Sequence, residues 1–270
     1  MELIAIVCII CIWNYLKNKK ESKDNIKISN VPQKLVLYGI PTLSVDSKET
    51  NSDKGAYGED LIHKEIKGFE IDGGKILRNI YIPREGAEST EIDLVLIYKG
   101  GIYVLESKNY SGWIFGSDDA KMWTQCLTQG RNKAAIKNQF LNTIYQNKLH
   151  IECLKKLLND YASGEFSERK REELVNSNFF ENKLKKQVPI HSIIVFSERC
   201  KLRDIKLTRN DTFVVKINDL KELIFNLNVK YYNCLNDNDI EWIYSVLQSY
   251  TMVSENFKEK HIENIRSKKQ

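Results

Sequence analysis

Residues 92–106 read Ile92-Asp-Leu-Val-Leu-Ile-Tyr-Lys-Gly-Gly-Ile-Tyr-Val-Leu-Glu106. Two runs of apolar and β-branched residues flank a Lys-Gly-Gly segment, a pattern that is typical of two strands joined by a tight turn. We therefore predict a β-hairpin, and we expect the rest of the fold to be built around it.

The length of the hairpin turn decides which polar side chains share a face. A two-residue turn at 99–100 would oppose Asp93 to Glu106, and one at 100–101 would oppose it to Lys108. Either register gathers all three polar groups on one face, because alternate residues of a strand project to the same side. A three-residue turn would scatter them instead. The hairpin thus predicts two carboxylates and an ammonium together, provided that the turn has two residues.

Such a cluster is costly in a core unless it is paired or binds a cation. We expect Asp93 and Glu106 to hold Mg²⁺ or Mn²⁺ through oxygen, the metal keeping several waters, while Lys108 orients the attacking water or steadies charge on a phosphate. The alternative is a surface salt bridge of little weight. Glu-x-Lys recurs elsewhere in the chain, for example at 65/67, so only its position at the end of a strand singles out this copy.

Other elements are predicted from helical or alternating spacing of apolar residues. Their order is α, β, β, β, α, β, β, which favours an α/β fold with a central mixed β-sheet flanked by helices. The expected elements outside the hairpin are a helix over 54–68, a strand over 75–82 with a polar loop over 84–90, a short strand over 113–115, a helix over 132–159, strands over 190–197 and 212–217, and helices over 218–227 and 238–251.

Composition sets the class of protein. A chain of 270 residues with 42% hydrophobic content can bury one good core. A charged fraction of 29% together with many aromatic residues argues against a disordered chain. Six scattered cysteines do not make a disulfide framework and fit a reducing compartment. The net charge of +5 is compatible with a polyanionic partner but does not identify one.

The N-terminus carries an apolar run over 3–13, extended to Leu16 and followed by Lys17, Lys19 and Lys20. We expect an N-terminal hydrophobic helix that anchors the chain to a membrane in a single pass, although its length is marginal. The basic cluster places the main domain on the cytoplasmic side. A signal peptide and a buried helix are the alternatives, and the lack of a small-x-small site argues against cleavage.

We predict the following division of the chain. It comprises a membrane anchor over 1–17, a tether over 18–53, a core over 54–160, a polar helical insertion over 161–187, a C-terminal continuation of the fold over 188–252 and a charged tail over 253–270.

Four motifs follow one another between residues 54 and 155. They read Gly55-Ala-Tyr-Gly58-Glu59, Glu91-Ile-Asp93-Leu-Val, Gly101-Ile-Tyr-Val-Leu-Glu106-Ser-Lys108-Asn109 with Gly112, and Asn142-Thr-Ile-Tyr-Gln146-Asn-Lys-Leu-His150-Ile-Glu-Cys-Leu154. In this order they resemble the nuclease-related domain (NERD) family. That family is grouped with the PD-(D/E)XK nuclease superfamily, so the resemblance implies a restriction-endonuclease-like core and a metal-dependent phosphodiesterase.

The resemblance also implies roles for individual residues. Asp93, Glu106 and Lys108 match the catalytic core, Glu59 matches the acidic residue of the first helix, and Gln146 matches the polar residue of the second. Two positions depart from the family pattern: Ser107 stands where Thr is usual, and Thr143 stands where Pro is usual. Neither is a predicted ligand.

Helical spacing independently places Asn142, Gln146 and His150 on one polar stripe, for which a solvent-exposed face is the alternative. Together with Glu91, Asn142 and His150 are candidate supporting groups of the site. Trp113 and Trp123 could stack a base, although core packing is the simpler interpretation.

The sequence thus favours a membrane-anchored, Mg²⁺-dependent nuclease that cuts DNA or RNA with a metal-activated water. One alternative is a non-catalytic nucleic-acid-binding or scaffold module at the membrane. Another is a membrane-associated protein whose domain binds other proteins. No reader of base edges is recognisable, so the sequence does not separate DNA from RNA.

Overall fold

The computed structural model describes residues 51–84, 87–129, 134–163 and 188–251. The predicted anchor, the charged tail, nearly all of the tether and most of the insertion lie outside these residues. Within the described ranges, no helix is both long and apolar enough to cross a membrane. The four cysteines of these ranges form no disulfide.

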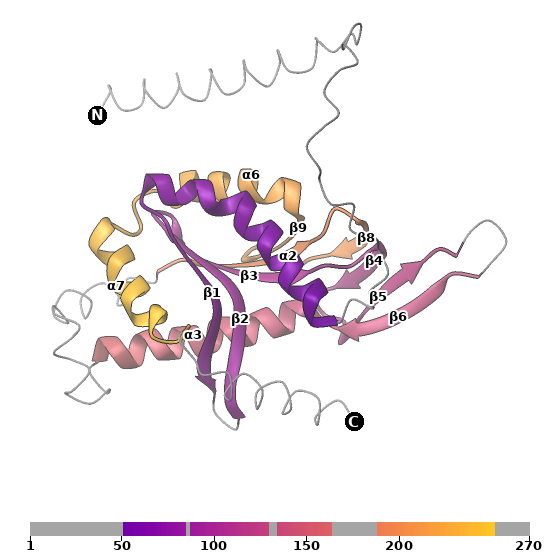
Figure 1. The fold of residues 1–270 in the computed structure, drawn as a ribbon, viewed down its shortest axis with the longest axis horizontal. Coiled ribbons are helices and arrows are strands. Elements are labelled where there is room, and N and C mark those ends of the chain that lie inside the picture. Colours follow the sequence, from indigo (N-terminus) through magenta and orange to yellow (C-terminus); the bar gives the residue numbers. More distant parts are fainter. Residues whose placement is uncertain (1–50, 85–86, 130–133, 164–187, 252–270) are drawn as a thin grey trace, which may run out of the picture. The chain divides into compact units, whose positions relative to one another are not determined.

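The first of two mixed sheets has five strands in the order β1-β2-β3-β7-β9 (Figure 1). β1, β2 and β3 pair antiparallel, whereas β7 lies parallel to β3 and β9 parallel to β7. The predicted central mixed sheet is therefore confirmed. Its strands are β1 (Lys75–Arg84), β2 (Ala87–Tyr98), β3 (Gly101–Lys108), β7 (Ile190–Phe196) and β9 (Thr212–Lys216).

Helices cover both faces of this sheet. α3 (Thr143–Ser163) and α7 (Asp237–Gln248) pack on the face that carries Val95 and Val104. α2 (Asn51–Ile66) and α6 (Ile217–Lys230) pack on the face that carries Leu96 and Leu105. A short 3-10 helix, η1 (Lys67–Asp72), extends α2. Because both faces are buried, residues 94–98 of β2 and 102–105 of β3 are apolar at every position instead of alternating.

A second sheet follows the end of the first. Its four strands lie in the order β6-β5-β4-β8, with β8 parallel to β4 (Figure 1). β4 comes directly after β3, and β8 comes directly after β7, so the parallel β3–β7 pair is continued by the β4–β8 pair. The strands are β4 (Gly112–Ser117), β5 (Met122–Leu127), β6 (Ile136–Leu141) and β8 (Cys200–Lys206).

Most of the wrongly predicted elements lie in this second sheet. The expected helix over 132–159 begins only at Thr143, because residues 136–141 pair with β5 as a strand. β5 and β8 were not predicted at all, and β2 already begins at Ala87, inside the expected loop. The sequence of β6 mixes polar and apolar residues without a clear period, so its conformation depends on its partner strand rather than on local preference.

The hairpin turn has two residues, as the predicted cluster of Asp93, Glu106 and Lys108 requires. Tyr98 pairs with Gly101, which leaves residues 99–100 as the turn and excludes the 100–101 alternative. Gly101 has a φ of +131°, and a Cβ there would lie 2.3 Å from the carbonyl oxygen of Pro189. Glycine is therefore required at this position both by the backbone conformation and by the close approach of a neighbouring segment.

Candidate functional site

The β2–β3 register brings the two predicted ligands together. Leu94–Leu105 is the last pair of the β2–β3 register, so Asp93 comes directly before a paired residue of β2 and Glu106 directly after its partner on β3. The two carboxyl groups are close enough for the charge of Glu106 to raise the pKa of Asp93. The Oδ2 atom of Asp93 accepts a hydrogen bond of 2.8 Å from the backbone N–H of Ser107. The backbone of β3 thus orients the carboxylate of β2.

Glu106 is the buried centre of the cluster, with only 1% of its surface exposed. The ammonium of Lys108 donates to Glu106 Oε1 and lies 3.4 Å from Oε1 of Gln146 on α3. Nδ1 of His150, also on α3, lies 3.5 Å from Glu106 Oε2. At that distance the two atoms form no hydrogen bond, and Glu106 Oε2 has no other hydrogen-bond partner among the described residues.

Glu59 approaches the cluster from α2. Helix α2 can lie close to β3 because residue 58 is glycine: a Cβ there would lie 2.8 Å from Ser107 Oγ. Arg78 of β1 forms an ion pair with Glu59, with 3.7 Å between Nη2 of Arg78 and Oε2 of Glu59. Glu91, two residues before Asp93 on β2, accepts a hydrogen bond of 2.9 Å from the hydroxyl of Tyr81.

The carboxylates of the cluster resist ionisation together. Burial, and then the charge of Glu106, raises the pKa of Asp93 to about 8. Burial, and then the charges of Asp93 and Glu91, raises the pKa of Glu59 to about 7. Burial also raises the pKa of Glu106, against the opposing effect of Lys108. Full ionisation of these carboxyl groups would place more negative charge in the site than one ammonium offsets, and a bound cation would relieve that charge.

The two basic groups behave differently. Burial disfavours the charge of Lys108, but the carboxylates of Glu106 and Asp93 outweigh burial and raise the pKa of the ammonium. Burial, followed by the charge of Lys108, lowers the pKa of His150 to about 3. At neutral pH, Lys108 is therefore the cation of the cluster and His150 is a neutral ring packed against Glu106.

The predicted polar stripe on α3 is not one surface. Gln146 is exposed, whereas His150 and Asn142 are buried. Asn142 makes its contacts away from the acidic cluster: its Oδ1 accepts from the N–H of Ile144, and its Nδ2 donates to the carbonyl oxygens of Ser117 at 3.1 Å and Ala120 at 2.7 Å. Asn142 thus caps α3 and joins the start of that helix to the β4–β5 turn.

Asn147 is a buried structural residue that the sequence did not reveal. Its Nδ2 donates to the carbonyl oxygen of Val104 and to Oγ of Ser192, both at 3.0 Å. It thereby ties α3 to β3 and β7 beside the cluster. An asparagine within a helix carries no local signal for this role, because both partners come from distant strands.

Replacement of Asn142 by alanine is expected to lower the free energy of unfolding by about 1 to 2 kcal/mol, because α3 loses its cap and two carbonyl oxygens of the β4–β5 turn lose their hydrogen bonds to Asn142. Urea unfolding measures the change. Asn142→Ser, whose hydroxyl can still cap the helix, should recover part of the loss. Equal stability of the alanine variant and the wild type would contradict the role of Asn142 in joining α3 to that turn.

The donor set fits a hard cation that keeps part of its hydration shell. No group of three or more His, Cys, Asp or Glu side chains in metal-binding geometry occurs in the described ranges. Asp93 and Glu106 nevertheless offer two carboxylates, and Glu106 Oε2 is a buried acceptor without a hydrogen bond. Mg²⁺ is commonly held by one or two carboxylates with water and substrate oxygens completing the shell.

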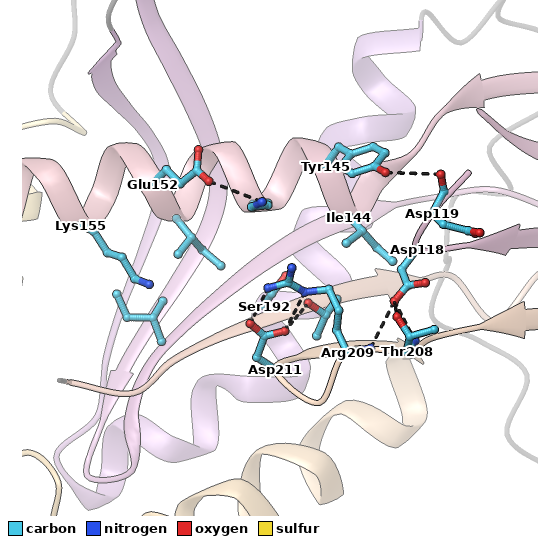
Figure 2. A pocket seen from close by; sticks show the side chains of 14 residues that line it. Asp118, Asp119, Ile144, Tyr145, Glu152, Lys155, Ser192, Thr208, Arg209 and Asp211 are labelled. Carbon is cyan, nitrogen blue, oxygen red and sulfur yellow. Dashed lines mark hydrogen bonds and ion pairs between the residues drawn. The ribbon is translucent and has the colours of Figure 1, made fainter. Parts of the chain in front are cut away.

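A separate cleft of about 350 Å³ lies on another flank of α3, against β7 and the segment before β9. Figure 2 shows that its charged groups largely contact one another: Arg209 pairs with Asp211, and Asp118 accepts from Thr208. None of the predicted catalytic residues lines it. The cleft therefore offers no support for placing the chemistry there.

Comparisons with known proteins agree with the motifs. Residues 54–197, more than half of the chain, match the family model described as "Nuclease-related domain". An uncharacterized protein of Bacillus anthracis is 25% identical over 234 residues, which cover 87% of this chain and 94% of that protein. No solved structure matches. The matched residues contain the hairpin, α3 and β7, and thus every element that contributes to the cluster except the first residues of α2.

Proposed function

The chain belongs to the nuclease-related domain family, and from that premise we propose that it is a metal-dependent nuclease whose site is the cluster on β2 and β3. The observation that carries the proposal is the buried Oε2 of Glu106, which has no hydrogen bond, in a side chain that lies near Asp93 and is paired with the charged Lys108. Membership of the family implies nucleic acid as substrate or partner. With η1 and strands β4, β5 and β6 set aside, the order α2, β1, β2, β3, α3, β7 supports a restriction-endonuclease-like arrangement of the core.

Each residue of the cluster has a role in this proposal. Asp93 and Glu106 would hold Mg²⁺ or Mn²⁺, which when bound supplies an acidified water and offsets charge on the phosphate. Lys108 stays protonated and can face a phosphate oxygen. Gln146, exposed at the start of α3 and 3.4 Å from Lys108, can orient that ammonium or a substrate oxygen.

Glu59 and His150 would act from opposite sides of the cluster. Glu59, with a pKa raised to about 7 by burial and by the charge of Asp93, can exchange a proton near neutral pH. His150 is neutral and buried, so it would support the position of Glu106 rather than transfer a proton. The charge of Glu91 contributes to raising the pKa of Asp93.

The test is cleavage of end-labelled DNA and RNA by the full-length chain in Mg²⁺, in Mn²⁺ and in EDTA. Cleavage is expected with either metal, and Asp93→Asn is expected to reduce it by about 1000-fold while binding of the strand persists. Glu152→Gln is the matched control, because this exposed acid of α3 pairs at the surface with Lys148. Cleavage in EDTA, or full activity of Asp93→Asn, would count against the proposal. Binding without any cleavage would favour the non-catalytic alternative.

Magnesium is also expected to stabilise the folded chain, because it binds a site that the unfolded chain lacks. At a concentration 100 times the dissociation constant, the gain is about 2.7 kcal/mol. Differential scanning fluorimetry should record a higher midpoint with MgCl₂ than with EDTA, and Glu106→Gln should remove most of the difference. A shift of equal size in that variant would place the bound metal elsewhere.

We further propose that the apolar run over 3–16 anchors the chain in a membrane with the nuclease-related domain on the cytoplasmic side. The support is the apolar sequence followed by Lys17, Lys19 and Lys20. Fractionation of cells that express the full chain should recover it with membranes, whereas deletion of residues 1–17 should release it. Recovery of the full chain in the soluble fraction would contradict an anchor.

A further inference from the structure

The two faces of the second sheet have opposite character. One face carries Ile114, Trp123 and Phe140 and packs against α3 and the end of β7. The other face carries Trp113, because neighbouring residues of a strand project to opposite sides. Trp123 is fully buried, whereas 41% of the Trp113 surface is exposed. Only one of the two tryptophans is therefore available to a ligand.

Cations surround Trp113 on that outer face. The strand registers align Lys201 of β8, Trp113 of β4, Cys126 of β5 and Lys137 of β6 in one row across the sheet, and paired residues share a face. The guanidinium carbon of Arg203 lies 5.4 Å from the centroid of the Trp113 ring. Lys137, Lys201 and Arg203 are all exposed.

The charge of this sheet is strongly one-sided. Its four strands contain Lys137, Lys201, Arg203 and Lys206 but a single acid, Asp204. That acid lies 3.7 Å from Lys206, and no ion pair with a carboxylate is found for Lys137, Lys201 or Arg203 among the described residues. The row that contains Trp113 is therefore positively charged and complementary to a phosphate backbone.

We infer that this outer face of the second sheet binds single-stranded nucleic acid, with a base stacked at Trp113 and phosphates at Lys201, Arg203 and Lys137. The inference deepens the proposed function and rests on it, since it names the form of the substrate. An exposed aromatic ring flanked by cations is the arrangement by which proteins bind single strands without reading their sequence. A duplex is expected to bind such a ring more weakly, because its bases are already stacked on one another and cannot stack on the ring.

The position of Trp113 suits a strand that also enters the proposed site. Trp113 follows Lys108 by five residues, so the two Cα atoms lie no more than about 18 Å apart. β4 leaves the end of β3 directly, and the site lies at that same end of β3. A strand of several nucleotides can therefore contact both places at once.

The experiment measures binding separately from cleavage. Fluorescence anisotropy of labelled deoxy- and ribo-oligonucleotides is recorded with the full-length chain in EDTA. Trp113→Ala is expected to weaken binding between about 5- and 100-fold, and Trp113→Tyr should restore most of it. Tyr145→Ala is the matched control, since Tyr145 is an exposed aromatic residue of α3 outside this face (48% exposed). It should bind as the wild type does.

Salt dependence tests the cations. The double variant Lys201→Gln with Arg203→Gln is expected to reduce the slope of log affinity against log salt by about 1.4, because each phosphate contact on a single strand contributes about 0.7. Lys148→Gln with Lys155→Gln, on α3, should leave the slope unchanged. An unchanged slope in the first variant overturns the inference.

The remaining outcomes separate this inference from the proposed function. Wild-type affinity in Trp113→Ala, or a duplex bound as tightly as its single strand, overturns the inference even if Asp93→Asn abolishes cleavage. Conversely, weakened binding in Trp113→Ala supports the inference even if the wild type cleaves nothing in Mg²⁺. Binding of DNA, of RNA or of both supports it, since all three use the same stacking and phosphate contacts.

Discussion

Replacing Glu106 by glutamine is expected to reduce Mg²⁺-dependent cleavage by about 1000-fold or more, because the proposed metal loses one of its two carboxylates and each 1.36 kcal/mol of lost transition-state stabilisation is tenfold in rate. The amide keeps the shape of the side chain, and its oxygen can still accept from Lys108. The measurement is kcat/KM at saturating Mg²⁺, alongside strand binding in EDTA. Retained binding with lost cleavage is the expected pattern, and cleavage within tenfold of the wild type would contradict the proposed ligand.

The same variant is expected to be at least as stable as the wild type at pH 8 in EDTA. Burial raises the pKa of Glu106, so the folded state binds a proton that the unfolded state has released. Stability therefore falls as the pH rises above the unfolded pKa of about 4.5, and the non-titrating amide avoids that loss. Urea unfolding at pH 5 and pH 8 should give a shallower decline for Glu106→Gln. An equal decline in both proteins would mean that Glu106 does not carry the unfavourable charge.

Replacing Trp123 by alanine is expected to lower the free energy of unfolding by about 3 to 5 kcal/mol. The indole is fully buried and lies parallel to the ring of Phe196, with 6.1 Å between centroids. Its Nε1 donates to the carbonyl oxygen of Ser117 at 2.9 Å. A Cβ on Gly116 would lie 2.2 Å from the indole, so the backbone of β4 packs directly against this side chain.

Trp113→Ala is the matched control for that measurement, because Trp113 lies in the same sheet with its ring partly in solvent. Its effect on stability should stay near 1 kcal/mol or below. Chemical unfolding of the two variants side by side tests the assignment of one tryptophan to the core and the other to the surface. Similar losses in both would contradict it.

The second sheet matters to the site even though it contributes no carboxylate to the cluster. β4, β5 and β6 stand between β3 and α3 in the chain, and Asn142 joins the β4–β5 turn to the first turn of α3. Gln146 lies four residues after Asn142. The position of Gln146 beside Lys108 therefore depends on the same sheet that presents Trp113, which couples the geometry of the site to the proposed strand-binding face.

The hairpin sequence by itself determined the centre of the site. Alternation along a strand has a period of two, so the two-residue turn at 99–100 predicts that Asp93, Glu106 and Lys108 come together. The same local patterns predicted α2, α6, α7, β7 and β9, because long apolar faces and strand runs are visible in short windows of sequence.

Only the tertiary structure decided which other groups join that centre, and where the second sheet forms. Gln146 reaches Lys108 and His150 reaches Glu106 because Asn142 and Asn147 fix α3 against distant parts of the chain. Arg78 of β1 forms an ion pair with Glu59 of α2. β6 and β8 are strands because β5 and β4 pair with them. Contacts between residues far apart in the chain leave no periodic signal in either segment, so they exist only once the chain has folded.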